Sequence, residues 1–359
     1  MANQKNQHFV PKVYLRQFSV EFDRRSVCVW LPGEGRIFEG ASIKGQCSKP
    51  YFYGKDRIIE NLYRHPETVY AKTIDNINRN QPIRSVDFEA ILFFWLVQNQ
   101  RSEKSLLEII RSEGSLRDAV KSYKGQDPDL EEFFGPKLGP KEAAQFALSE
   151  AKTKFEVLRG LRCVMIKNNT DFEFFTSDNP ATFSNKLYFN KFKFSKNYGI
   201  GNSGLYVFLP ISPKLGFLAF DNFVYKVPKM QGEYLNLSRK DAISLNMLTY
   251  LNHHKCIYSN NYETLDLARC MFENENIQKI EDIIKTHLAV IDFERSMNGK
   301  TVFISATPED FVKSRRGLIH TERKPIRFTN HPRFLKYSVR PKYKDTRSEA
   351  GLIRPDLEV

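Results

Sequence analysis

The sequence predicts an α+β fold in which small mixed sheets surround a helical middle. Runs of β-branched and aromatic residues bounded by turn residues occur before about residue 54 and again after about residue 163. Between them, apolar residues recur with the period of a helix. Strands and helices do not alternate as they do in βα units, so a doubly wound nucleotide-binding sheet is not expected.

The first part predicts a hairpin followed by helices. Val27–Leu31 and Arg36–Phe38 flank the turn sequence PGEG, which is typical of a β-hairpin. Apolar residues after residue 56 predict two helices separated near Pro66. The clearest helix is expected from Ser85, which can cap it, and it carries the apolar run at 91–97.

The later elements are expected as follows. A polar loop with a short helical piece covers Gly114–Pro140, and a helix covers Lys141–Arg159. We expect strands at Cys163–Ile166, Phe172–Phe175, Leu205–Leu209, Gly216–Phe220, Cys256–Tyr258 and Thr301–Ser305. Helices are expected at Ser238–Asn252, at Glu263–Ile291 and after ATPED at 306–310. The predicted division is an α+β domain at 1–262 and a C-terminal extension at 263–359.

Positive charge is concentrated near the C-terminus. The 359 residues include 55 Lys and Arg against 42 Asp and Glu, which gives a net charge of +13. Residues 311–347 hold twelve of the basic residues and two acidic ones, a net charge of +10. The rest of the chain is therefore nearly neutral, and the charge indicates a polyanionic partner for one segment.

The sequence also indicates the cellular compartment of the protein. The N-terminus carries no apolar signal region, and the longest apolar run, 91–97, is far shorter than the roughly 18 residues of a membrane span. Five widely spaced cysteines include no CxxC pair. We expect a cytoplasmic protein with no membrane association and no disulfide framework.

Standard catalytic signatures are absent, but three short stretches carry candidate chemistry. His8, beside an aromatic-rich segment, is either a general base or a hydrogen-bonded histidine at the core edge. Gln98 and Arg101 share a helix face, and Arg101 either pairs with an acid or faces an anionic ligand. In Ser177-Asp178-Asn179-Pro180, Asp178 is a base, a metal ligand, a partner of His8 or Arg101, or the acceptor of an Asx turn.

Metal binding has weaker support in the sequence. Glu60 and Glu67 with Asp178 would offer oxygen ligands to Mg²⁺, although no motif supports such a site. Glu67 is equally explained as a first-turn residue at the positive end of a helix dipole. No metal site is predicted, and the sequence does not indicate which cofactor, if any, the protein uses.

These stretches together resemble the bacterial domain-of-unknown-function family 4238. The resemblance covers about residues 7–262 and is carried by short motifs in a fixed order: His8, Val10, Pro11, Tyr14, Leu15 and Phe18; Tyr53-Gly54; Ile59-Glu60; Glu67; Gln98 and Arg101; Ser177–Pro180; Pro210–Pro213; and Leu245-Asn246. It implies that His8, Arg101 and Ser177–Pro180 form one recurring set that converges in space. It implies no reaction, because the function of the family is not established.

Two stretches combine basic and aromatic residues. Twelve Lys and Arg of 311–347 alternate with Phe328, Phe334, Tyr337 and Tyr343, and residues 186–198 hold four lysines among five aromatics without an acid. Cations meet phosphates and aromatic rings stack on bases in nucleic-acid grooves. A solvated face with a tail is the alternative.

The leading functional hypothesis is a nucleic-acid- or nucleotide-directed hydrolase, nuclease-like, whose bacterial setting suggests a defence or toxin effector. Arg101 would hold a phosphate, His8 would move the proton, and Asp178 would orient it or bind a metal. The expected substrate-binding residues are Arg16, Gln98, Ser177, Asn179, Lys313, Arg315, Arg316, Arg323, Lys324 and Arg327. The alternatives are a non-catalytic nucleic-acid-binding module, or a scaffold whose basic segment meets an acidic protein partner.

Overall fold

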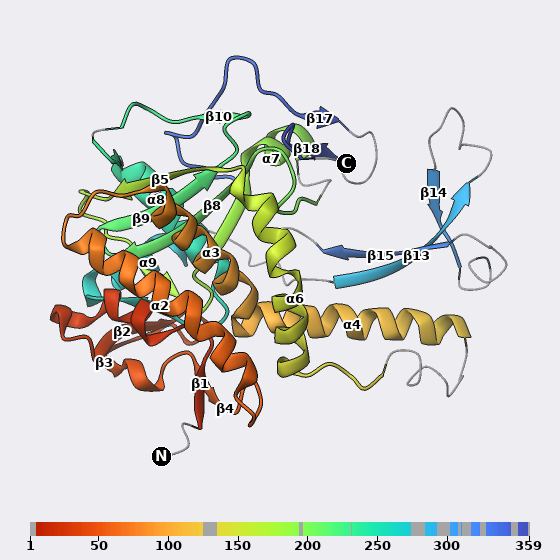
Figure 1. The fold of residues 1–359 in the computed structure, drawn as a ribbon, viewed down its shortest axis with the longest axis horizontal. Coiled ribbons are helices and arrows are strands. Elements are labelled where there is room, and N and C mark those ends of the chain that lie inside the picture. The colour runs from red at the N-terminus through yellow and green to blue at the C-terminus, as the bar shows by residue number, and fades with distance from the viewer. Residues whose placement is uncertain are drawn as a thin grey trace.

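A five-stranded sheet with helices on both faces forms the centre of the protein in the computed structural model (Figure 1). The structure describes residues 5–124, 135–193, 197–230, 232–273, 284–292, 302–307, 310, 317–323, 328–345 and 351–357. The sheet has the order β11-β5-β9-β8-β7, with β11 parallel to β5 and the other neighbours antiparallel.

The helices of the described residues are α1 Lys12–Leu15, α2 Ile58–Asn78, α3 Ser85–Arg101, α4 Glu103–Lys124, α6 Pro140–Arg159, α7 Lys186–Phe192, α8 Arg239–Asn252 and α9 Tyr262–Phe272. The strands before the central helices are β1 Asn6–His8, β2 Ser26–Leu31, β3 Arg36–Ser42 and β4 Ser48–Pro50. The strands of the middle are β5 Arg162–Lys167, β6 Thr176–Ser177, β7 Thr182–Asn185, β8 Leu205–Ser212, β9 Leu215–Phe220, β10 Tyr225–Lys226, β11 Tyr234–Asn236 and β12 Ile257–Ser259. The C-terminal strands are β13 Ile284–Asp292, β14 Val302–Ser305, β15 Gly317–Arg323, β16 Lys336–Tyr337, β17 Lys344–Asp345 and β18 Leu352–Ile353.

Strand β8 shows why both faces of the central sheet are covered. Successive strand residues point to opposite faces, and β8 is apolar at nearly every position. Val207 and Leu209 pack with helices α2, α3 and α6, whereas Phe208 packs with α8 and α9. The sheet is therefore the middle of three layers (Figure 1).

A second sheet, β3-β2-β12-β6, lies beside the first and joins the N-terminal segment to the chain after α8. Trp30 of β2 is fully buried, and its ring stacks on Tyr250 of α8 with centroids 5.3 Å apart. The small pair β1-β4 sits at the edge of this region (Figure 1).

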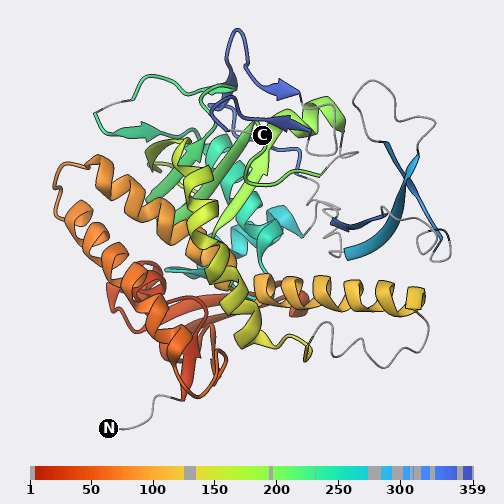
Figure 2. The same cartoon turned by 45° about the vertical axis from the view of Figure 1, so that its right-hand side comes forward.

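The C-terminal part has two portions with different positions. The sheet β14-β13-β15 lies beside α4, away from the central layers (Figure 2). Residues 328–345 and 351–357 return to the body, where β16 pairs with β10 and Phe328, Phe334 and Leu335 enter the core. Residues after the part that resembles the family therefore contribute to the core of that part.

Several expectations are confirmed by the structure. The α+β class, the β2–β3 hairpin, the β8–β9 pair, the strands β5, β12 and β14, and the helix α6 lie close to the predicted ranges. Helix α8 begins as predicted, with Ser238 accepting from the Asp241 backbone N–H in a capping box.

Two expectations in the helical middle are wrong. Residues 58–78 form one helix through Pro66. Only the Leu62 carbonyl loses its helical partner there, and water can satisfy it because Leu62 is 55 % exposed. Residues 114–124 continue α4 instead of forming a loop, with a Glu113–Arg117 ion pair one turn apart.

Other boundaries differ for tertiary reasons. Helix α3 begins at Ser85, but Arg84 is its cap residue, and Asp87 accepts from the Arg84 backbone N–H at 2.9 Å. Residues 172–175 are not a strand, because the side-chain amide of Asn246 takes the place of a neighbouring strand. It donates to the Glu173 carbonyl at 2.8 Å and accepts from the Phe175 N–H at 3.3 Å.

The predicted long helix Glu263–Ile291 is also wrong in its second half. Helix α9 ends at Phe272, and β13 at 284–292 pairs with both β14 and β15. Strand pairing on both sides outweighs the helical spacing of its apolar residues. Most of the helix expected after ATPED lies outside the described residues.

Candidate functional site

The N-terminal segment is held against the end of α3 by two side chains of one helix face. Strand β1 pairs with β4 and carries the chain toward α3. Gln98 Nε2 donates to the Phe9 carbonyl at 2.8 Å, and Arg101 Nη2 donates to the His8 carbonyl at 2.5 Å. The predicted shared face of Gln98 and Arg101 is confirmed, and both side chains bind backbone.

Arg101 occupies a closed environment. Its side chain is 3 % exposed, and Nη1 lies 2.6 Å from Glu67 Oε1 of α2. The guanidinium carbon lies 4.2 Å from the ring centroid of Tyr63, and the Tyr53 hydroxyl donates to the Arg101 carbonyl at 2.9 Å. The ion pair and the aromatic face compensate the cost of burying the charge.

The imidazole of His8 is largely buried next to this arginine. Burial is the main cause that lowers its pKa to about 4, with Lys12 and Arg101 adding to the effect. The ring is therefore neutral near pH 7. Among the described residues, His8 Nε2, Gln98 Oε1 and Arg101 Nε are buried without a hydrogen-bond partner.

Asp178 anchors a different segment. Its carboxylate accepts from the backbone N–H groups of His254, Lys255 and Cys256 at 2.8, 2.7 and 3.1 Å. These partners lie more than 70 residues along the chain, so the arrangement is not a local Asx turn. In the described structure Asp178 makes no hydrogen bond to His8 or Arg101.

Asn179 links this segment to the end of α3. Asn179 and Asn252 exchange two hydrogen bonds of 3.0 Å between side-chain amide and backbone carbonyl. Ser102 Oγ, directly after α3, donates to Asn179 Oδ1 at 2.7 Å, and Ser177 Oγ accepts from the Asn179 N–H. The resembling motifs thus meet around the α3–α4 junction, as the resemblance implies, through a chain of contacts to backbone.

Each of the three acidic candidates for a metal site has a different interaction partner. Glu60 pairs with Arg57 at 3.0 Å, Glu67 with Arg101, and Asp178 with backbone N–H groups. Across the part of the chain that the structure describes, no three His, Cys, Asp or Glu side chains are grouped to hold a metal ion.

Sequence reasoning missed a charge cluster at the start of α4. Glu103, 8 % exposed at its side chain, lies 2.7 Å from Lys49 Nζ and 2.8 Å from Lys255 Nζ. Hydrogen bonding by His254, followed by the two lysines, holds the pKa of the Glu103 carboxyl well below its usual range. The partners come from residues 49 and 254–255, so no spacing in the sequence could have indicated them.

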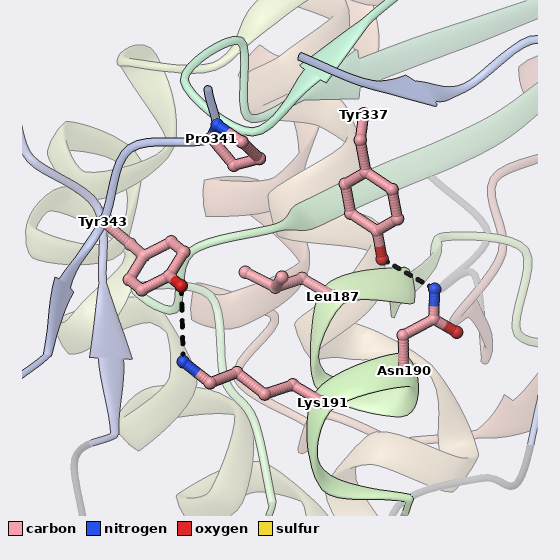
Figure 3. Close-up of a pocket in the computed structure, with 6 residues that line it drawn as sticks. All are labelled: Leu187, Asn190, Lys191, Tyr337, Pro341 and Tyr343. Carbon is pink, nitrogen blue, oxygen red and sulfur yellow. Dashed lines mark hydrogen bonds between the residues drawn. The ribbon is translucent and has the colours of Figure 1, made fainter. Parts of the chain in front are cut away.

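Parts of the two basic, aromatic stretches, α7 and residues 336–344, lie against each other (Figure 3). Helix α7 carries Lys191, whose Nζ lies 4.6 Å from the ring centroid of Tyr343 and 3.4 Å from its hydroxyl. Asn190 Nδ2 donates to the Tyr337 hydroxyl at 2.9 Å, and that hydroxyl donates to the Lys186 carbonyl at 3.0 Å. We call the surface formed by α7 and residues 336–344 the basic aromatic surface.

A hollow of about 320 Å³ opens on this surface, lined by Leu187, Asn190, Lys191, Tyr337, Pro341 and Tyr343 (Figure 3). The lining contains no carboxylate, and further exposed cations lie on the same two segments or directly beside them in the sequence: Lys193, Lys336, Arg340, Lys342 and Lys344. Asp345 is the acidic residue that follows. The hollow therefore combines ring surfaces with positive charge, the combination that suits bases and phosphates.

The remaining predicted binding residues lie elsewhere. Arg16 is exposed at the end of α1. Arg323 ends β15, beside α4. Lys313, Arg315, Arg316, Lys324 and Arg327 lie outside the described residues. Among the described residues, no hydrogen bond or ion pair joins Arg16 or the basic aromatic surface to His8, Arg101 or Asp178.

Comparison with known proteins places the chain in a family. The model of the family described as protein of unknown function (DUF4238) matches residues 6–263, so the chain belongs to this family. No curated protein and no solved structure matches the chain. No helix among the described residues has the length and apolar character needed to cross a membrane.

Replacement of Arg101 tests its role in stability. Arg101→Met leaves Glu67 and the His8 carbonyl without their partner, so we expect the free energy of unfolding to fall by about 3 kcal/mol. Arg101→Lys should recover little, because an ammonium cannot reproduce the forked contact. Urea unfolding followed by tryptophan fluorescence measures both. Arg159→Met, which removes an exposed ion pair with Glu89, should cost less than about 1 kcal/mol. A similar cost for both sites would contradict this role.

The lowered pKa of His8 predicts a dependence of stability on pH. Unfolded histidine binds a proton below about pH 6.5, whereas folded His8 does so only below about 4. The unfolded state therefore binds more protons in this window, and stability falls as the pH drops from 6.5 to 4. We expect His8→Gln to reduce this fall by about 2 kcal/mol. Burial also lowers the pKa of His331, but His331 is present in both the wild type and His8→Gln, so it contributes equally to both. Parallel curves of stability against pH for the two proteins would therefore refute the prediction.

Proposed function

We propose that the protein binds single-stranded nucleic acid through the basic aromatic surface. The observation that carries the proposal is that two basic, aromatic stretches, separated by about 150 residues in the chain, form one hollow. Residues outside the family match, 336–344, supply two of its aromatic rings.

The chemistry of the hollow favours an unpaired base. Tyr343 is 37 % exposed, and stacking of a base on an aromatic ring contributes about 1–3 kcal/mol. The surrounding lysines and arginine attract the phosphates on either side of that base. In a duplex the base faces are covered by their neighbours, so a single strand fits this hollow better.

Hydrolysis of a nucleic-acid strand at His8 and Arg101, which do not line the hollow of the basic aromatic surface, is the second candidate. The observation in its favour is that His8, Gln98 and Arg101 each keep a buried polar atom without a partner in the described structure. Unsatisfied buried groups are costly and often belong to functional sites. As the sequence predicts, His8 would move the proton and Arg101 would hold the phosphate. Asp178 would act only indirectly, by holding residues 254–256 in place.

Binding is tested by fluorescence anisotropy with a labelled 20-nucleotide single strand at several salt concentrations. Tyr343→Ala should weaken binding about 5- to 100-fold through lost stacking. Lys191→Gln should weaken it and reduce the slope of log K against log salt by about 0.7, the value for one phosphate contact of a single strand.

The matched control is Lys152→Gln, which removes an exposed lysine from α6. It should bind as the wild type does. Wild-type affinity in both Tyr343→Ala and Lys191→Gln, or no binding at low salt, would refute the basic aromatic surface as the interface.

Cleavage is tested on the same labelled strand with wild type, His8→Ala and Asp178→Ala purified identically. The hydrolase hypothesis predicts product with the wild type and at least a hundredfold loss in both variants. Melting temperatures must be measured alongside, because both residues lie in the buried network. Equal cleavage by all three proteins would indicate contamination and exclude these catalytic roles.

A further inference from the structure

A second and larger cavity, of about 660 Å³, lies at the junction of α3, α4 and α6. Its volume falls in the range of small-molecule sites, roughly 300–1,000 Å³. It is separate in its lining from the hollow of the basic aromatic surface. Asn179, which belongs to the motif Ser177–Pro180, and Asn99, next to Gln98, contribute to its wall.

One part of the wall is apolar. Leu96 of α3, Ile109 of α4 and Phe146 of α6 all border the cavity. Phe146 is 54 % exposed, so its ring is accessible to a ligand in the cavity. These side chains offer a surface against which an apolar body can be desolvated.

The other part of the wall carries a lysine that is influenced by the charge of Glu150, one turn earlier on α6, but forms no ion pair with it among the described residues. Lys154 of α6 is half-buried, and no carboxylate of the described residues forms an ion pair with its Nζ. With the Gln100 amide oriented to donate to the Ala147 carbonyl, its oxygen accepts from Lys154 Nζ at 3.0 Å. Burial lowers the pKa of Lys154, and the charge of Glu150 offsets this effect only in part.

The carboxylates of the wall do not fill this role. Glu113 is bound by Arg117, one turn along α4. Glu108 also borders the cavity and is engaged in an interaction of its own. The ammonium therefore points to a ligand that brings the negative charge itself.

We propose that this cavity binds a small amphipathic organic anion. Its acid group lies at Lys154 and Gln100, and its aromatic or aliphatic body lies against Leu96, Ile109 and Phe146. A carboxylate and a phosphate share the chemistry that Lys154 recognises. The site does not depend on the nucleic-acid proposal, because no residue of the basic aromatic surface lines it.

The experiment uses two fluorescent probes of similar size on the full chain. 8-Anilinonaphthalene-1-sulfonate is an aromatic anion, and N-phenyl-1-naphthylamine is its uncharged analogue. Lys154→Met should weaken binding of the anionic probe at least tenfold and leave binding of the uncharged probe within twofold. The methionine keeps the apolar stem, so retained binding of the uncharged probe also shows an intact cavity.

Two further variants and two competitors complete the design. Lys152→Met, on the same helix but exposed, should bind both probes as the wild type does. Ser112→Phe, which fills the cavity from α4, should abolish binding of both probes. Displacement of the anionic probe by decanoate or by decyl phosphate distinguishes the two acid groups.

Three results would overturn the proposal. The first is equal affinity of the anionic probe for the wild type and Lys154→Met. The second is equal loss in Lys152→Met, which would indicate attraction to surface charge alone. The third is unchanged binding of both probes in a folded Ser112→Phe variant, which would locate the probes elsewhere.

Discussion

The burial of Arg101 is the constraint on which the arrangement of the N-terminal half depends. A guanidinium removed from water must find its charge and hydrogen-bond partners within the protein. It finds them in Glu67 of α2 and in the His8 carbonyl of β1, at the end of the most apolar helix. One side chain therefore fixes a strand and two helices relative to one another.

Asp178 holds distant segments together in the second half of the described chain, as Arg101 does in the first half. Each buried charged side chain binds groups that are distant in the sequence. Asp178 accepts hydrogen bonds from the backbone N–H groups of 254–256. Arg101 binds Glu67 and the His8 carbonyl. Asn179 and Ser102 connect the two arrangements. The short motifs that mark the family are thus largely positions where side chains hold distant backbone. Asn179 of this framework also borders the larger cavity, whereas none of its residues lines the hollow of the basic aromatic surface.

The fold was predictable where local pattern and burial agree. The continuous apolar run that buries β8 on both faces and the capping box of α8 are both visible in the sequence. The prediction failed where contacts with residues distant in the sequence determine the secondary structure. Asn246 replaces a strand beside residues 172–175, and β13 is a strand because β14 and β15 pair with it on either side. The chain itself carries no local sign of either partner.

The sequence by itself determined the fold class, the family and the concentration of positive charge near the C-terminus. It also indicated that Arg101 needs a partner, because an unpaired charge after a buried helix is costly. Only the tertiary structure decided that this partner is Glu67, and that Lys191 lies over the ring of Tyr343. The physical reason is that charge and apolar period are properties of the chain, whereas a hollow forms only when packing brings remote segments into contact.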